Sequence, residues 1–172
     1  YVSLLTNPSF FFEDAVLGHR DRLVAEITER DAVSRLGFIN LRSLEDAGYT
    51  FALDDVGTAF MDPFTDAGQA NLMGLAQANL PISTIKIDRS YVEKLAAPQT
   101  AEQPYTAWDI VDCVCQLGFT PKHLVLEGYY PSDAWWSTVF DLKIWWEQQG
   151  GESFSVAGIT GYETATYERA GG

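Results

Sequence analysis

Four charged side chains stand near the ends of three apolar, strand-like segments: Glu26, Asp54, Asp55 and Lys86. Adjacent carboxylates repel each other, so a buried pair such as Asp54 and Asp55 needs protons, hydrogen bonds or cations. Divalent ions meet this need because they prefer oxygen ligands. Gly57 follows the pair and lets the backbone turn sharply beside a ligand. The residue types therefore predict metal and phosphate chemistry.

Spacing within each segment indicates which side chains face the same way. Residues two apart on a strand share a face, so Lys86 and Asp88 are expected to project together. Glu29 would point away from Glu26, which makes Glu26 the better candidate for a shared site. Each segment alone has a simpler interpretation, because an Asp-Asp pair before glycine is typical of a solvated turn and alternation is typical of an edge strand. The occurrence of all three segments together, each with charged residues at a strand end, is a more specific sign of a shared site.

Strands and helices alternate along the chain and must position these residues. The helices end at glycines or begin at capping residues, as the helix-boundary rules predict. Two surface loops are expected, at 97–104 and at Met61–Gln69. The expected strands are Val2–Leu5, Arg22–Thr28, Thr50–Asp54, Thr84–Asp88, His123–Gly128 and Ser153–Ile159. The expected helices are Asp31–Ala47, Thr106–Leu117, and one from Ser132 or Asp133 to about Gln149.

This order predicts an α/β fold in which residues 1–172 form a single domain of the TIM-type (β/α) barrel class. Alternating strands and helices favour parallel pairing with right-handed crossovers. In such barrels the carboxyl ends of the strands gather catalytic groups at one rim. An open doubly wound sheet is the alternative, although the sequence has no GxGxxG or Walker motif. The six expected strands are two short of a closed barrel.

The helix after Ser132 is rich in aromatic residues. Its main stripe follows helical spacing and is formed by Trp135, Val139, Leu142 and Trp146, widened by Trp136, Phe140, Ile144 and Trp145. We interpret it as a helix packed on the barrel and covered by its neighbours. The alternative is an aromatic patch for a partner subunit, because large exposed apolar areas mark interfaces.

Composition limits the classes of partner and location. The net charge of −13 argues against polymeric nucleic acid, which is bound by basic groups, but a small phosphate ligand could reach the site through divalent cations. Cys113 and Cys115 are two apart, which suits neither a CxxC redox pair nor a zinc knuckle and indicates buried free thiols. No membrane-spanning run or signal peptide is evident, so we expect a cytoplasmic location, with a membrane tether in a longer parent left open.

Taken together, the three segments resemble the EAL domain, a family of cyclic di-GMP phosphodiesterases. The matching stretches are Glu26-Ile-Thr-Glu29, Leu53-Asp-Asp-Val-Gly-Thr-Ala59 and Ile85-Lys-Ile-Asp-Arg-Ser90. They look like the family's Glu-Ile-Thr-Glu, Leu-Asp-Asp-Phe-Gly-Thr-Gly and Ile-Lys-Ile-Asp-Arg-Ser. The resemblance is strong from about Leu23 to Val92 and implies an EAL-like barrel.

The resemblance also implies roles for individual residues. Glu26 and Asp54 would ligate one Mg²⁺ or Mn²⁺ ion, and Asp55 would serve a second. Lys86 would hold or help deprotonate the attacking water, and Asp88 would lie close to ligand or metal. A two-metal site of this kind activates water and neutralises charge on the phosphodiester oxygens, and the product would be linear pGpG.

The start of the chain departs from the family pattern. The Glu-Ala-Leu signature is absent, and so are the two strands of its region, so we expect the first strands of the barrel, with one metal carboxylate, to be missing from this chain. Where the family has an asparagine, the simplest alignment gives Leu5. Asn7 lies two residues on with the same facing and is the candidate ligand-binding residue.

After residue 118 two alignments are possible. In the first, His123–Gly128 corresponds to the family's Ala-Glu-Gly-Val-Glu segment, which makes Glu127 a metal carboxylate and leaves Tyr130 at the second glutamate. In the second, the segment from Val156 takes this place and Gly158 replaces the first glutamate. The strand count favours the first alignment.

Three functions follow from these features. The first is metal-dependent hydrolysis of cyclic di-GMP to pGpG in the complete parent, with this chain alone expected to be impaired. The second is an inactive EAL-like module that binds cyclic di-GMP or a protein partner. The third is an unrelated magnesium-dependent barrel enzyme. The resemblance further implies a possible homodimer and sensory or GGDEF-type domains in the parent.

Overall fold

The computed structural model describes residues 8–28, 35–58, 61–99, 105–128, 130 and 132–157. In this part of the chain a five-stranded, all-parallel sheet has the order β1-β2-β3-β4-β5. Its strands are β1 (Val24–Ile27), β2 (Thr50–Val56), β3 (Ile82–Ile87), β4 (His123–Glu127) and β5 (Ser153–Ala157). The predicted α/β class with parallel pairing is confirmed.

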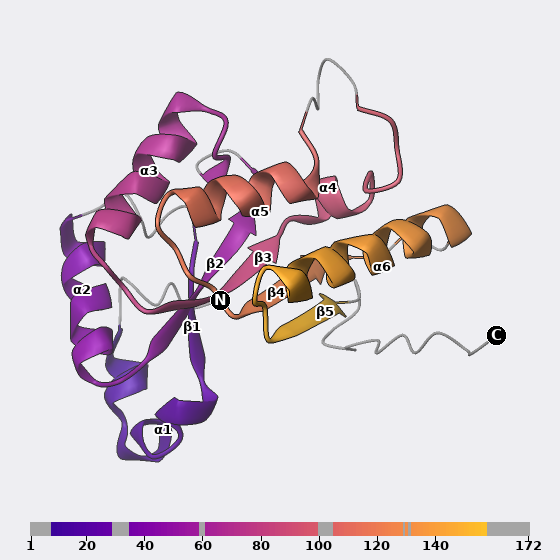
Figure 1. Cartoon of the computed structure of the whole chain (residues 1–172). Coiled ribbons are helices and arrows are strands. Elements are labelled where there is room, and N and C mark those ends of the chain that lie inside the picture. The colour runs from indigo at the N-terminus through magenta and orange to yellow at the C-terminus, as the bar shows by residue number, and fades with distance from the viewer. Residues whose placement is uncertain are drawn as a thin grey trace.

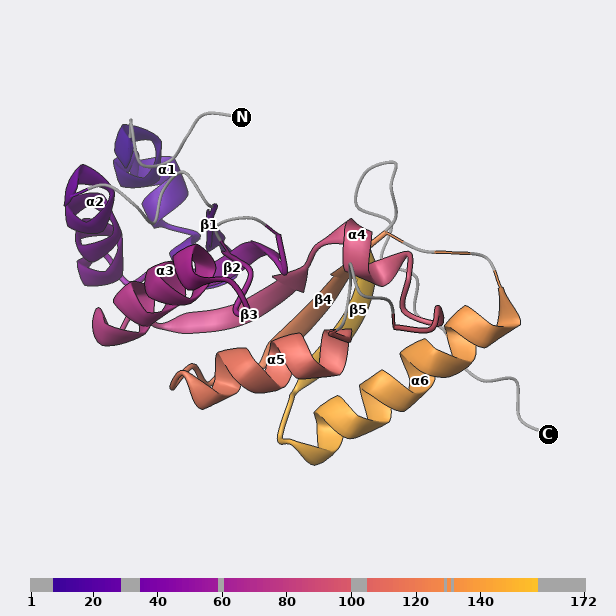
Figure 2. The same ribbon diagram turned by 90° about the horizontal axis from the view of Figure 1, so that it is seen from above.

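Helices connect consecutive strands. In Figures 1 and 2, α3, α5 and α6 lie side by side along one face of the sheet, and α2 continues the row at its β1 end. Short helical turns precede β1, and the small helix α4 follows β3 at the carboxyl end of the sheet. The bounds are η1 (Pro8–Phe12), α1 (Asp14–Leu17), η2 (Arg20–Arg22), α2 (Arg35–Asp46), α3 (Asp66–Gln77), α4 (Arg89–Val92), α5 (Ala107–Gln116) and α6 (Asp133–Gln148).

The two faces of the sheet differ in chemistry. Side chains that point toward the helices are apolar and fully buried, and include Leu53, Ile85 and Leu124. The strand register places mostly small or polar side chains on the opposite face, with Val24 and Val125 among them; the others include Glu26, Ala52, Thr84, His123 and Ser155. Because the helices pack on the apolar face, the polar face is left to carry the site.

The strand order bears on the choice between barrel and doubly wound sheet. A doubly wound sheet reverses its strand order at one point and carries helices on both faces. The five described strands run in chain order without such a reversal, as consecutive strands of a (β/α) barrel do. The expected strand Val2–Leu5 lies outside the described residues.

One expected loop is wrong in its second half. Met61–Gln69 was expected to be a surface loop, but α3 begins at Asp66 and is capped by Thr65, whose side chain accepts a hydrogen bond from Gly68 N at 3.1 Å. Gly68 is a poor helix former that weakens the sequence signal. A Cβ atom there would lie 2.1 Å from the Asp62 carbonyl oxygen, so close packing requires the glycine.

The other helices agree closely with the sequence. α5 has a capping box between Thr106 and Asp109 and ends before Gly118, whose φ is 103°. Of the two candidate caps of α6, the structure selects Ser132, which accepts a hydrogen bond from Trp135 N. The first part of the expected helix at 31–34 lies outside the described residues. The sequence therefore located the main helices except α3.

The aromatic stripe of α6 packs into the core, as interpreted. Its main members are all buried: Trp135, Val139, Leu142 and Trp146. Ile144, on the widened part of the stripe, is 50% exposed. The helix therefore uses its main stripe for internal packing against the sheet.

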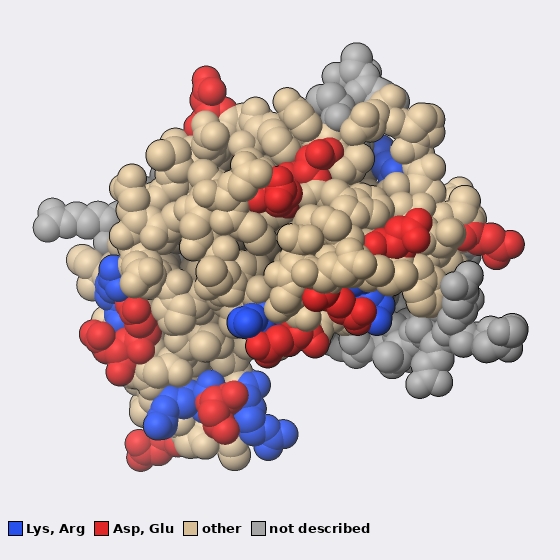
Figure 3. Space-filling model, viewed as in Figure 1, with Lys and Arg blue, Asp and Glu red and all other residues tan. Residues whose placement is uncertain are grey.

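Surface charge and cysteines complete the description. On the face seen in Figure 3, acidic side chains are scattered, whereas the basic ones gather mainly over the α1 end of the molecule. Cys113 and Cys115 are free and only partly buried rather than fully buried, and burial raises the pKa of both thiols. Among the described helices, none has the length and apolar character needed to cross a membrane.

Candidate functional site

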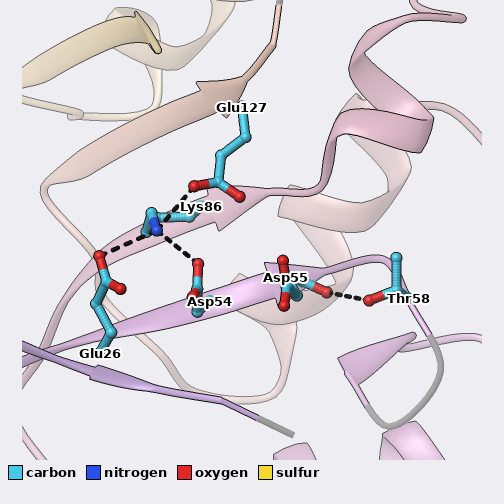
Figure 4. Close-up of polar contacts among 6 residues, drawn as sticks. All are labelled: Glu26, Asp54, Asp55, Thr58, Lys86 and Glu127. Carbon is cyan, nitrogen blue, oxygen red and sulfur yellow. Dashed lines mark hydrogen bonds and ion pairs between the residues drawn. The ribbon is translucent and has the colours of Figure 1, made fainter. Parts of the chain in front are cut away.

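Lys86 lies at the centre of the candidate site, at the carboxyl end of β3. Its Nζ atom forms ion pairs with carboxylates from three other strands, as Figure 4 shows. The distances are 2.6 Å to Asp54 Oδ1, 2.8 Å to Glu127 Oε1 and 3.0 Å to Glu26 Oε1. The predicted convergence of Glu26, Asp54 and Lys86 at one rim is thus observed, and Glu127 joins them.

A β-bulge places Asp55 at the same rim as Asp54. Strict alternation would send these neighbours to opposite faces of β2. The pairing with β3 shifts between Leu53 and Val56, so that β2 has one extra residue there. Asp55 takes up this residue with a φ of 52°, a left-handed conformation that Asp tolerates better than most residues.

The turn after Asp55 is held by its own hydrogen bonds. The hydroxyl of Thr58 donates to the Asp55 carbonyl oxygen at 2.8 Å, and the Thr58 amide donates to the same oxygen at 3.1 Å. The Gly57 amide donates to the Met61 carbonyl oxygen at 3.1 Å. The sequence indicated a role for Gly57 but none for Thr58, although Thr58 belongs to the same segment.

Asp54, Asp55 and Glu127 form a donor set that fits a divalent cation. Each offers one carboxylate oxygen, and these oxygens lie within 4.8 Å of one another. Oxygen donors of this kind suit Mg²⁺ and Mn²⁺ rather than soft metals. Glu26 is not part of this donor set, and it contacts the site through its ion pair with Lys86.

The crowding of carboxylates changes their proton affinity. Burial, followed by repulsion from Asp54, Glu127 and Asp88, raises the pKa of Asp55 to about 6. Burial also raises the pKa of Glu127, against the opposing effect of Lys86. A cation bound among these groups would offset the repulsion that adds to the effect of burial on both pKa values.

The same environment keeps Lys86 charged. Burial alone would lower its pKa, but hydrogen bonds to Asp54 and Glu127, attraction to Asp54 and a hydrogen bond to Glu26 outweigh burial and raise the pKa well above its usual value. Lys86 is therefore a protonated hydrogen-bond donor at neutral pH.

The pKa of Asp55 predicts pH-dependent metal binding. Below pH 6 this carboxyl is mostly protonated and neutral, and a metal must displace its proton. We expect the association constant for Mn²⁺ to rise about tenfold between pH 5 and pH 7.5, because the deprotonated fraction of a group with this pKa rises by that factor. Isothermal titration calorimetry across this range measures it. Asp55→Asn should flatten this rise, and an equally steep rise in that variant would contradict the assignment.

The two other predicted site residues are Asp88, whose charge acts on Asp55, and Asn7. Asp88 follows β3 instead of ending it, and its Oδ1 atom accepts a hydrogen bond from Ser90 N at 2.7 Å, which caps α4. Its contact with a ligand or metal stays a prediction. Asn7 and Gly158 lie outside the described residues, as does Leu5, and Tyr130 is 54% exposed. The place of Glu127 in the site agrees with the first of the two alignments.

Gly57 offers a test of how tightly the Asp55 turn is packed. Its φ is 104°, and a Cβ atom would lie 2.9 Å from the Tyr91 ring. Gly118 has nearly the same φ, 103°, with nothing within 4 Å. We expect Gly57→Ala to lower the free energy of unfolding by about 1–3 kcal/mol more than Gly118→Ala, because only the first adds overpacking to backbone strain. Equal losses in urea unfolding would contradict this packing.

Comparison with known proteins gives no relatives. No family model matches the chain, and neither a curated protein nor a solved structure matches it.

Proposed function

We propose that this chain carries the metal centre of an EAL-type phosphodiesterase, which hydrolyses cyclic di-GMP to linear pGpG with Mg²⁺ or Mn²⁺. The observation that carries the proposal is the meeting of Asp54, Asp55 and Glu127 beside Lys86 at the carboxyl ends of three adjacent strands. Active sites of (β/α) barrels lie at this end of the strands. The same segments carry the resemblance to the EAL family.

The fold supports a barrel as the parent architecture. Five parallel strands in chain order, with helices along one face, are what part of a barrel wall would present. We propose that further β/α units close this wall. The donor set would then lie at the carboxyl-end face of the barrel.

Each residue has a defined task in the proposed reaction. Asp54, Asp55 and Glu127 would hold the ion, and Glu26 with Asp54 holds Lys86 in place. When bound there, a divalent ion would supply activation of water and stabilisation of charge on the phosphodiester oxygens. Because Lys86 is kept protonated, its ammonium group would not accept a proton from the attacking water, and it would donate to that water only in place of one of its three carboxylate partners.

Enzymatic assay of the complete parent protein tests the proposal. Incubation with cyclic di-GMP and either Mg²⁺ or Mn²⁺ should release pGpG, which chromatography separates from the substrate. Omission of metal or addition of a chelator should stop the release. Absence of turnover with both metals would overturn the hydrolytic function.

A second candidate, a binding module without hydrolysis, is favoured by the ion pairs of Lys86, which form without a metal. Lys86 already pairs with Glu26, Asp54 and Glu127 without any ion, so three of the four carboxylates at the rim have a cationic partner in the absence of metal. Calorimetric titration of the parent with cyclic di-GMP in Ca²⁺ tests this candidate. Binding without turnover would support it. A titration that shows no heat of binding would exclude cyclic di-GMP as the ligand and leave a protein partner as the remaining form of this candidate.

A further inference from the structure

We propose that the short helix α4 sets the spacing of the metal carboxylates, with Tyr91 and Arg89 as its two positioning residues. The inference rests on the proposed metal centre and deepens it. α4 follows Lys86 directly after β3, and its side chains contact the turns that follow Asp55 on β2 and Glu127 on β4. One four-residue helix thus contacts both neighbouring parts of the site.

Tyr91 contacts the turn after Asp55. A Cβ atom on Gly57 would lie 2.9 and 3.0 Å from ring atoms Cδ2 and Cε2 of Tyr91, and 3.1 Å from Ile110. The bare Cα of Gly57 therefore packs against the edge of the ring. Because Gly57 is two residues after Asp55, whose φ is 52°, this contact limits how far the bulge can move.

Arg89 makes the corresponding contact on the other side. A Cβ atom on Gly128 would lie 3.0 Å from Arg89 Cγ, 3.5 Å from Cδ and 3.6 Å from Cβ. The aliphatic stem of Arg89 therefore packs on the backbone directly after Glu127. Its guanidinium points elsewhere, since Nε donates to Glu93 at 2.5 Å.

α4 is itself anchored to the core and to the sheet. The indole Nε1 of Trp135, which is fully buried, donates to the Val92 carbonyl oxygen at 2.6 Å. At the other end of α4, the Asp88 amide donates to the Val56 carbonyl oxygen at 3.1 Å and extends the β2–β3 pairing. A helix fixed at both ends can transmit its position to the two turns that it contacts.

Substitution of Tyr91 tests the first contact. We expect Tyr91→Ala to weaken Mn²⁺ binding about tenfold, the lower end of the loss seen when a direct partner of a metal ligand is removed, because Tyr91 acts through the backbone of Gly57. Tyr91→Phe keeps the contacting ring atoms and should restore wild-type affinity. Calorimetry with MnCl₂, at a temperature where circular dichroism shows all variants folded, measures the dissociation constant. Equal affinity of wild type and Tyr91→Ala would overturn the role of Tyr91.

Arg89 allows a matched comparison that does not disturb the core. Arg89→Ala removes both the stem over Gly128 and the ion pair with Glu93, whereas Glu93→Ala removes only the ion pair. Both residues are exposed, so both variants should fold. We expect weaker Mn²⁺ binding in Arg89→Ala and unchanged binding in Glu93→Ala. Equal affinities in the two variants would overturn the role of the stem.

The outcomes separate this inference from the proposed function. Wild-type protein that binds no Mn²⁺ would overturn the metal centre and the positioning role with it. Wild-type protein that binds Mn²⁺, with unchanged affinity in Tyr91→Ala and Arg89→Ala, would overturn the positioning role alone. Neither conclusion requires turnover of cyclic di-GMP to be measured.

Discussion

Lys86→Met is expected to lower the free energy of unfolding of the metal-free protein by about 3–5 kcal/mol at pH 7, the usual loss when one partner of a buried ion pair is removed. Lys86 is 15% exposed and Asp54 8% exposed, so water screens this pair weakly. Without the ammonium group, Asp54 and Glu127 face each other as uncompensated charges. Urea unfolding followed by circular dichroism measures the loss.

An exposed lysine provides the control for this prediction. Lys122 pairs with Glu152 at 3.2 Å, but these side chains are 51% and 62% exposed. Lys122→Met makes the same change of charge and shape, and we expect it to alter stability by less than about 1 kcal/mol. Similar losses in the two variants would mean that Lys86 does not stabilise a carboxylate cluster.

Acid and metal should each rescue the Lys86→Met variant. Burial already raises the pKa of Glu127, and removal of the lysine takes away the charge that opposes this rise, so the folded-state pKa of Glu127 lies further above its unfolded value. For acids this penalty is present at high pH and disappears as pH falls through the folded-state pKa, so stability relative to wild type should recover from pH 7 toward pH 5. MgCl₂ should stabilise the variant at pH 7, because an ion can replace the lost positive charge.

The sequence predicted the parts of the site that depend on local pattern. The apolar runs around Ala52 and Ile85 placed their charged neighbours at strand ends, because alternation and parallel pairing leave few other arrangements. Glu127 became a candidate only through an alignment, and the order β2-β3-β4 explains why it reaches Lys86. The positions of the strands in the sequence and the order of the strands therefore predicted most of the geometry of the site.

Other features were not readable from local pattern. The bulge at Asp55 reverses the alternation rule for one residue, and it depends on hydrogen bonds and on the packing of Gly57 against Tyr91, which lies far along the chain. α3 was missed because its glycines and small residues give a weak helical signal, while Gly68 is needed for a backbone contact with Asp62. Tertiary contacts determine both the bulge and the position of α3, and a single sequence does not show such contacts.

Asp54→Asn should have the largest effect on activity. Asp54 is buried and touches both halves of the site, since it forms the shortest ion pair with Lys86 and belongs to the metal donor set. Asparagine keeps the shape but loses the negative charge that both the lysine and a cation require. We expect Mn²⁺ binding to be lost and the rate of pGpG release by the complete parent to fall by at least about 10²- to 10³-fold, as for the loss of one preorganised electrostatic group.

The control for Asp54→Asn must make the same Asp-to-Asn substitution at a position far from the rim. Asp46 is exposed at the end of α2, and Asp46→Asn makes the same substitution there. We expect this variant to bind Mn²⁺ and release pGpG as wild type does. Loss of one negative charge from a protein of net charge −13 changes its long-range field little, so a large effect confined to Asp54 must arise within the site. Wild-type metal affinity in Asp54→Asn would exclude Asp54 as a ligand and with it the proposed centre.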